Sequence, residues 1–351
     1  MRDIFAFVRC SRILAAASLV RVAVALTLLL AIVPVAGAQQ LFQTPEDAAK
    51  ALAVAAKSGD VRAIMRVLGP EGAEIASSGD PVADTAVRKR FAAAYEMKNR
   101  VAVDGDKATL IVGEGGWPFP IPLIRRNETW RFDAALGKQE ILQRRIGRNE
   151  LSAIQACLAF VDAQEEYAEK DRTGAGVGVY AQRIVSRPGR KDGLYWPAQA
   201  GDESPIGELA ARATAEGYRV GQGRTPFHGY YYKVLTRQGP SARGGAMDYI
   251  VRGNMIGGFA LVAYPAEYDN SGVMTLIVNQ DGTVYEKDLG PNTNGIASSM
   301  TAFDPDSSWR KVVNNGLPQP KRKEGEAQAK PSEGEPPAKP NAGEAQAKPG
   351  Q

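Results

Sequence analysis

The chain has 351 residues, of which 44% are hydrophobic, and this is enough for one or two domains with buried cores. Its formal net charge is +4, but residues 1–38 hold four Arg and one Asp, so the remainder carries only +1. A nearly neutral chain gives no electrostatic reason to expect binding to nucleic acid or to an anionic membrane surface. Of the two Cys, only Cys157 follows residue 38, which excludes an internal disulfide there.

Residues 1–38 predict a secretory signal peptide. A basic start is followed by an apolar run over 22–35 and by Ala36-Gly37-Ala38, a small-residue end typical of a cleavage site. The alternative is an uncleaved membrane anchor, but a spanning helix needs ~20 apolar residues, and this run is shorter and contains Pro34. We therefore expect cleavage after Ala38, a mature protein in the periplasm or cell envelope, and no stable membrane anchor after cleavage.

The segment 39–137 predicts an N-terminal α+β domain. Thr44 has the side chain of a helix cap and Pro45 suits the first helical position, so a helix is expected to begin there. Further helices are expected over 61–68 and 84–98. After them the hydrophobic period changes to that of short strands. The expected strands are 100–103, 108–113, 121–126 and 128–133.

The segment 138–313 predicts a second unit, a long helix followed by an antiparallel meander. An amphipathic stretch over 138–170 is expected to link the two units, with a loop-like region and a short helix over 208–216 after it. Alternating aromatic and aliphatic runs then fill 226–290 almost without polar residues. Within them, Asp281-Gly282 predicts a two-residue hairpin turn between Val278 and Val284, because such a turn needs positive φ at both positions.

Both halves resemble known folds in the order of their elements. Helices before a small sheet over 44–133 resemble the cone-shaped nuclear transport factor 2 type, whose cone often carries a His or Asp. This segment has no His, which favours a ligand pocket or a scaffold over catalysis. The second half, with NELSAIQACLAFVDAQEEYAEKD before the meander, resembles a type IV pilin or pseudopilin headgroup. A pilin places its assembly segment at the start of this helix, whereas here a whole domain precedes it.

Six lines of sequence carry a longer resemblance. They are DGLYWP at 192–197, SPIG at 204–207, PFHGYYYKVLTRQGP at 226–240, GGAMDY at 244–249, the run MIGGFALVAYPAEYDNSGVMTLIVNQDGTVYEKDLG at 255–290, and FDPDSSW at 303–309. With these lines the chain is similar to domain-of-unknown-function family 2950, a family of exported bacterial proteins. The resemblance implies export and this architecture, and it supplies no activity or site residues.

The residues 314–351 predict a disordered tail of Lys, Glu, Pro and Gly. The motif EAQAKP occurs twice, and from Leu317 onward there is no aromatic or β-branched residue that could build a core. Truncation after Val313 should therefore leave the melting temperature unchanged, which a thermal scan of both proteins would check. A loss of several degrees, equivalent to roughly 1 kcal/mol or more, would show that the tail docks on the body.

A search for reactive groups finds little catalytic chemistry. His228 is the only His, so a Ser-His-Asp hydrolase would have to use it, but no G-x-S-x-G motif accompanies it and a turn-stabilising role is the alternative. Cys157 lies on an apolar helix face and is expected to be buried and inert. With one His and one later Cys, no zinc site of the finger type is expected.

Two binding interpretations remain open for the meander. Tyr230 and Tyr232 alternate with Tyr231 in a strand, so they share one side and offer an aromatic contact surface, with core packing as the alternative on either face. Calcium is a second idea, since oxygen ligands follow the meander, but the hairpin already explains the first of them and the EF-hand spacing is absent. Those oxygen-bearing residues are Asp281, Asp288, Asn292 and Asn294.

The sequence therefore predicts an exported envelope protein that acts as a non-catalytic binding or assembly module, with an envelope protein or a small ligand as its partner. We assign no catalytic, cofactor-binding or metal-binding residues, and no cofactor. Contact candidates are His228, Tyr230 and Tyr232. The alternative is a periplasmic hydrolase that uses His228.

Overall fold

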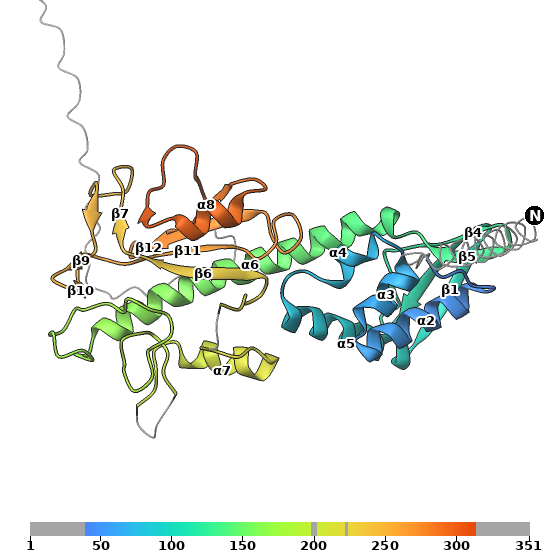
Figure 1. Cartoon of the computed structure of the whole chain (residues 1–351), viewed down its shortest axis with the longest axis horizontal. Helices are drawn as coiled ribbons and strands as arrows, with labels where there is room; N and C mark the ends of the chain where they lie inside the picture. Colours follow the sequence, from blue (N-terminus) through green and yellow to red (C-terminus); the bar gives the residue numbers. More distant parts are fainter. Residues whose placement is uncertain (1–38, 198–201, 222–223, 314–351) are drawn as a thin grey trace, which may run out of the picture.

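The computed structural model describes residues 39–197, 202–221 and 224–313, so the predicted signal peptide and tail lie outside the described residues. Two units lie along one long helix, α6 (Ala134–Ala168), as Figure 1 shows. The fold is α+β, as predicted, and its sheets are almost entirely antiparallel. The predicted boundary between residues 137 and 138 falls inside α6, whose two parts contact different units.

The N-terminal unit places four helices against one sheet. The helices are α2 (Pro45–Ser58), α3 (Val61–Leu68), α4 (Gly72–Ala76) and α5 (Pro81–Met97). The strands are β1 (Asn99–Asp104), β2 (Lys107–Val112), β3 (Trp117–Pro118), β4 (Leu123–Arg126) and β5 (Thr129–Phe132). The strand order is β1-β2-β4-β5, with β3 paired to β2. Leu52, Ile64, Leu123 and Phe132 are among the side chains of its core.

The first helix begins where the sequence predicts. The side chain of Thr44 accepts a hydrogen bond from the amide of Asp47 at 3.1 Å, and Pro45 occupies the first turn. Gly59 ends the helix in the left-handed conformation, with φ of 73°, and its amide donates back to Ala56. Local capping chemistry therefore specifies α2 without help from the rest of the chain.

One turn differs from the sequence prediction. The prediction of a two-residue turn at Asp281-Gly282 is wrong, because the last pair between β12 and β13 is Ile277 with Tyr285. The strands are therefore joined by a longer loop, in which only Gly282 has positive φ. The amide of Gly282 donates to Asn279 O and the amide of Asp281 to the Asn279 side chain, so an Asn-based turn replaces the expected one.

A tight two-residue turn does occur in the N-terminal unit. Asn127 and Glu128 join β4 to β5, with Arg126 paired to Thr129, and both turn residues have positive φ, 50° and 65°. This is the pattern of a type I′ turn, although neither residue is a glycine. The sheet register therefore imposes a conformation that Glu128 by itself does not favour.

The C-terminal unit contains a five-stranded sheet in the order β15-β13-β12-β11-β6. These strands are β6 (Tyr230–Leu235), β11 (Ala260–Pro265), β12 (Met274–Asn279), β13 (Tyr285–Asp288) and β15 (Arg310–Lys311). A smaller sheet has the order β14-β7-β8, and β9 pairs with β10. The small strands are β7 (Arg237–Gln238), β8 (Met247–Asp248), β9 (Ile250–Val251), β10 (Asn254–Met255) and β14 (Ala302–Phe303).

Helices cover both faces of the five-stranded sheet, with α6 on one side and α8 (Thr293–Ser299) on the other (Figure 1). The predicted apolar face of α6 is confirmed, because Ile154, Cys157 and Val161 are all buried in the core. Burial raises the pKa of the Cys157 thiol to about 12. The thiol is therefore protonated at neutral pH and unreactive, as the sequence predicts. The remaining helix of this unit, α7 (Gly207–Glu216), lies beside β6 and α6.

A buried carboxylate joins the two units. Asp80 caps α5 by accepting from the amides of Val82 and Ala83 at 3.1 and 3.0 Å. Its other oxygen accepts from the Tyr218 hydroxyl at 2.8 Å and from the amide of Gly229 at 2.9 Å, both in the C-terminal unit. The Asp80 side chain is fully buried, so these four donors satisfy a charge that would otherwise be costly to bury.

A second polar contact between the units surrounds Arg145 on α6. Its guanidinium donates to the carbonyls of Glu74 and Ile75 in the N-terminal unit and to the side chain of Asn270 in the other. Asn270 in turn donates to Ser77 O at 2.9 Å. Because these groups are largely buried and hydrogen-bonded across the junction, they oppose separation of the two units.

Candidate functional site

His228 lies in a tight turn that begins strand β6. Its φ is 50° and that of Gly229 is 76°, while Phe227 and Tyr230 exchange both backbone hydrogen bonds across the turn. His is among the residues that tolerate positive φ, so the backbone alone gives His228 a structural role. Its Nε2 lies 3.3 Å from Glu216 Oε2, and its ring contacts Phe227 and Tyr218. None of these three neighbours is a Ser, Thr or Cys nucleophile.

Tyr218 connects this turn to the N-terminal unit. Its hydroxyl donates to Asp80 and accepts from the amide of His228 at 3.2 Å. Burial, followed by the negative charge of Asp80, raises the pKa of the Tyr218 hydroxyl, which therefore stays protonated as the donor. The Tyr218 side chain thus attaches the segment after α7 to the first unit, and the same hydroxyl holds the backbone of His228.

The tyrosines of β6 have different environments. Tyr230 is fully buried and donates to Met274 O at 2.9 Å, so its predicted place on a contact surface is corrected to a place in the core. Tyr231 and Tyr232 are half-buried, and each lines a pocket beside the strand. Burial raises the pKa of the Tyr232 hydroxyl well above its ordinary value, so it remains a neutral polar group.

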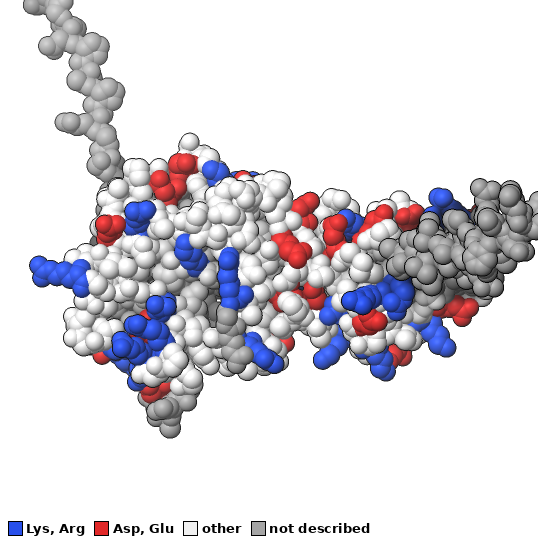
Figure 2. Space-filling model, viewed as in Figure 1, with Lys and Arg blue, Asp and Glu red and all other residues white. Residues whose placement is uncertain are grey.

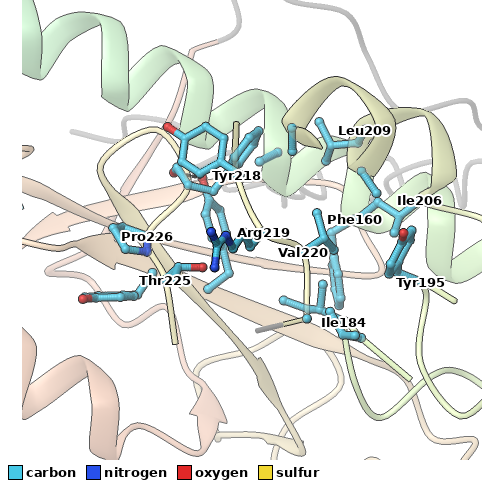
Figure 3. Close-up of a pocket in the computed structure, with 18 of the residues that line it drawn as sticks. Phe160, Ile184, Tyr195, Ile206, Leu209, Tyr218, Arg219, Val220, Thr225 and Pro226 are labelled. Atoms are coloured by element: carbon cyan, nitrogen blue, oxygen red, sulfur yellow. Dashed lines mark hydrogen bonds between the residues drawn. The ribbon is translucent and has the colours of Figure 1, made fainter. Parts of the chain in front are cut away.

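This pocket, called the α7 pocket below, has a volume of about 350 Å³ and is shown in Figure 3. Phe160 comes from α6, Leu209 from α7 and Leu261 from β11, so three elements far apart in sequence enclose it. The lining is mainly aliphatic and aromatic. Its remaining members are Ala156, Ile184, Val185, Tyr195, Ile206, Ala210, Ala213, Tyr218, Arg219, Val220, Gly221, Arg224, Thr225, Pro226, Phe227, Tyr231 and Tyr232.

Two arginines provide the charge of the α7 pocket. The guanidinium of Arg224 lies 4.4 Å from the ring centroid of Tyr231 and donates to the Tyr264 hydroxyl, which holds it against the sheet. Arg219 lies among the labelled residues of Figure 3 and is exposed to solvent. No acidic residue occurs among the described residues that line this pocket. An apolar cavity with a few polar groups at its wall is the usual form of a small-molecule site.

Four of the six sequence lines that carry the family resemblance contribute to this lining. Tyr195 comes from DGLYWP, Ile206 from SPIG, Phe227 from the line at 226–240, and Leu261 from the line at 255–290. Of the predicted contact residues, only Tyr232 lines the pocket among the described residues; His228 and Tyr230 do not. Arg219 and Arg224 were not predicted from the sequence, where the available signal was their closeness to the aromatic line at 226–240.

One of the residues considered as calcium ligands, Asp288, has other contacts. Asp288 accepts from the amide of Gly290 at 2.8 Å and from the Tyr268 hydroxyl at 3.2 Å. Over the described ranges, no group of three or more His, Cys, Asp or Glu is placed to hold a metal ion. Within the same ranges, no helix has an apolar stretch long enough to cross a bilayer.

Comparison with curated proteins and with solved structures finds no match. The resemblances to a nuclear transport factor 2 type domain and to a pilin headgroup therefore stay predictions. A protein family does match, over residues 39–312, which include both units and the α7 pocket. Since this match covers more than half of the sequence, the chain belongs to the family described as Protein of unknown function (DUF2950).

Proposed function

We propose that the protein is an exported, non-catalytic binding protein that holds a small, mainly apolar ligand in the α7 pocket. The observation that supports the proposal is the pocket itself, since about 350 Å³ lies within the usual range for small-molecule sites. Export is supported by the basic start, apolar run and Ala36-Gly37-Ala38 end of residues 1–38.

The lining favours binding over chemistry. Apart from Arg219, Arg224 and Thr225, its side chains are apolar or aromatic, and the hydroxyl of Tyr218 donates to the carboxylate of Asp80. His228, the residue on which the hydrolase alternative depends, has Glu216, Tyr218 and Phe227 as its neighbours. A hydrolase would need a nucleophile within hydrogen-bond reach of this ring. That alternative stays a prediction without a supporting contact.

A pocket-filling variant tests the binding function. Leu209→Trp places a larger side chain in the cavity, so we expect binding of the uncharged fluorescent probe phenylnaphthylamine to weaken by about tenfold or more. Ala211→Trp is the matched control, because Ala211 is on the same helix, is exposed and lies outside the pocket lining. Fluorescence titration of the mature protein measures both. The proposal would be contradicted if the unsubstituted protein did not bind the probe, or if the two variants bound it equally.

A further inference from the structure

A second pocket adjoins the α7 pocket and has a different character. Its volume is about 540 Å³, and it shares Val185, Tyr195, Val220 and Gly221 with the α7 pocket, so the two pockets adjoin along these residues. We call it the basic pocket. Its other lining residues are Ser186, Arg187, Pro188, Gly189, Arg190, Lys191, Trp196, Pro197 and Asp202.

The charge of the combined linings is strongly one-sided. Among the described residues that line the two pockets, five are cationic and one, Asp202, is acidic. Figure 2 shows Lys and Arg side chains gathered at the lower left of the molecule, over the loop that precedes α7. The cationic residues are Arg187, Arg190, Lys191, Arg219 and Arg224.

Ion pairs neutralise part of this charge. Arg187 lies 2.5 Å from Asp192, and Lys191 lies 2.6 Å from Asp202. Neither Arg190 nor Arg219 has a carboxylate within ion-pair distance among the residues that the structure describes, and both are exposed. Arg190 follows Gly189, whose φ of 72° closes a turn in which the amide of Arg190 donates to Arg187 O. Two guanidinium groups are therefore free to pair with an anion.

We propose that the ligand is an amphiphilic anion, with an alkyl chain in the α7 pocket and a carboxylate or phosphate head where the two pockets adjoin, so that Arg190 of the basic pocket and Arg219 of the α7 pocket can pair with it. This rests on the proposed function, and it names the chemical class of the ligand. An apolar chain gains most of its binding free energy by leaving water for the aromatic lining. The acidic head meets guanidinium donors suited to carboxylate and phosphate oxygens. A cationic head would meet repulsion from the same groups.

Binding of matched twelve-carbon ligands to the mature protein tests the proposal. The ligands are dodecanoate, dodecyl phosphate, dodecanol and dodecyltrimethylammonium, used below their micelle concentrations, with inorganic phosphate as the head group alone. Displacement of phenylnaphthylamine reports their affinities. We expect the two anions to bind about tenfold or more tightly than dodecanol, because one charge-assisted contact supplies about that ratio. The cationic ligand should bind more weakly than dodecanol.

Charge-neutralising variants locate the head group. In Arg190→Gln combined with Arg219→Gln, we expect the anions to lose most of their advantage while dodecanol binds as before. Arg212→Gln is the matched control, since Arg212 is exposed on α7 and lies outside both linings. It should leave all four affinities unchanged. Because the three arginines are exposed, these variants are expected to fold normally.

Failure of the two proposals is distinguishable. If dodecanol binds and Leu209→Trp abolishes its binding, but the anions have no advantage, the α7 pocket binds ligands and the amphiphilic anion is refuted. An advantage of the anions that survives in the Arg190 and Arg219 double variant would also refute it. If inorganic phosphate binds as tightly as dodecyl phosphate, the chain plays no part and the proposal fails. If neither dodecanol nor phenylnaphthylamine binds, the proposed function itself fails.

Discussion

Replacing Asp80 with alanine is expected to reduce the free energy of unfolding by about 4 kcal/mol or more. Loss of the helix cap on α5 accounts for ~1 kcal/mol of this. The substitution also removes the acceptor of the Tyr218 hydroxyl and of the Gly229 amide, and each hydrogen bond to a charged group contributes about 1.5–3 kcal/mol. Urea denaturation of the mature protein measures the difference.

Asp60→Ala is the matched control for this prediction. Asp60 is also the cap of a helix, α3, but its carboxylate accepts from the amide of Arg62 in its own turn and lies 3.8 Å from Arg66 of the same helix, and Asp60 is exposed. We expect this variant to lose only ~1 kcal/mol. The difference between the two variants then measures the contribution of the contact between the units. Equal losses within ~1 kcal/mol would mean that Asp80 acts as an ordinary cap.

Two glycines in helix α6 are expected to respond to alanine with opposite signs. Gly137 packs against the chain before β4, and an added Cβ would lie 2.5 Å from Pro120 O and 2.7 Å from the Cα of Ile121. Both are backbone atoms, so the helix and the sheet would have to move apart. We therefore expect Gly137→Ala to lower the free energy of unfolding by about 1–3 kcal/mol or more, as overpacking does, despite the better helix propensity of alanine.

Gly147 provides the comparison within the same helix. An added Cβ there meets no atom within 4 Å, and Gly147 is exposed. Alanine should therefore raise the free energy of unfolding by roughly 0.5–1 kcal/mol, since it removes the conformational freedom of a helical glycine. Denaturant titrations of both variants give the two signs. Stabilisation by Gly137→Ala would show that α6 does not contact residues 120–121 as described.

Elements whose signals are local could be predicted from the sequence alone. Helix α2 begins after Thr44 because a hydroxyl acceptor and a proline suit its first turn, and these act within a few residues. Strands β6 and β12 follow from runs of aromatic and branched residues that a buried sheet requires. The buried, inert Cys157 follows from the apolar spacing of α6. Such patterns need no knowledge of where the rest of the chain lies.

The conformations of the turns depend on the register of the strands that they join, which only the tertiary structure shows. Asn127 and Glu128 adopt positive φ because the register of β4 with β5 leaves only two residues between the strands. The more typical Asp281-Gly282 pair lies in a wider loop, since the pairing of β12 with β13 ends at Ile277 and Tyr285 and the side chain of Asn279 accepts from the amide of Asp281. Local preferences of about 1 kcal/mol are outweighed by the packing of a whole sheet.

The candidate site depended on tertiary structure even more. The α7 pocket is lined by Phe160, Leu209 and Leu261, each about fifty residues from the next along the chain. A pattern within one helix or strand therefore cannot indicate that they lie together. The sequence predicted helix α5 from residue 84 and did not indicate Asp80, and only the folded chain shows Asp80 as its cap, with Tyr218 and Gly229 against its second oxygen. Of the elements that line the α7 pocket, the sequence alone indicated only the aromatic strand β6 as a contact surface. A pocket that can bind a ligand forms only where segments distant in the sequence pack together, because the pocket is the space between them.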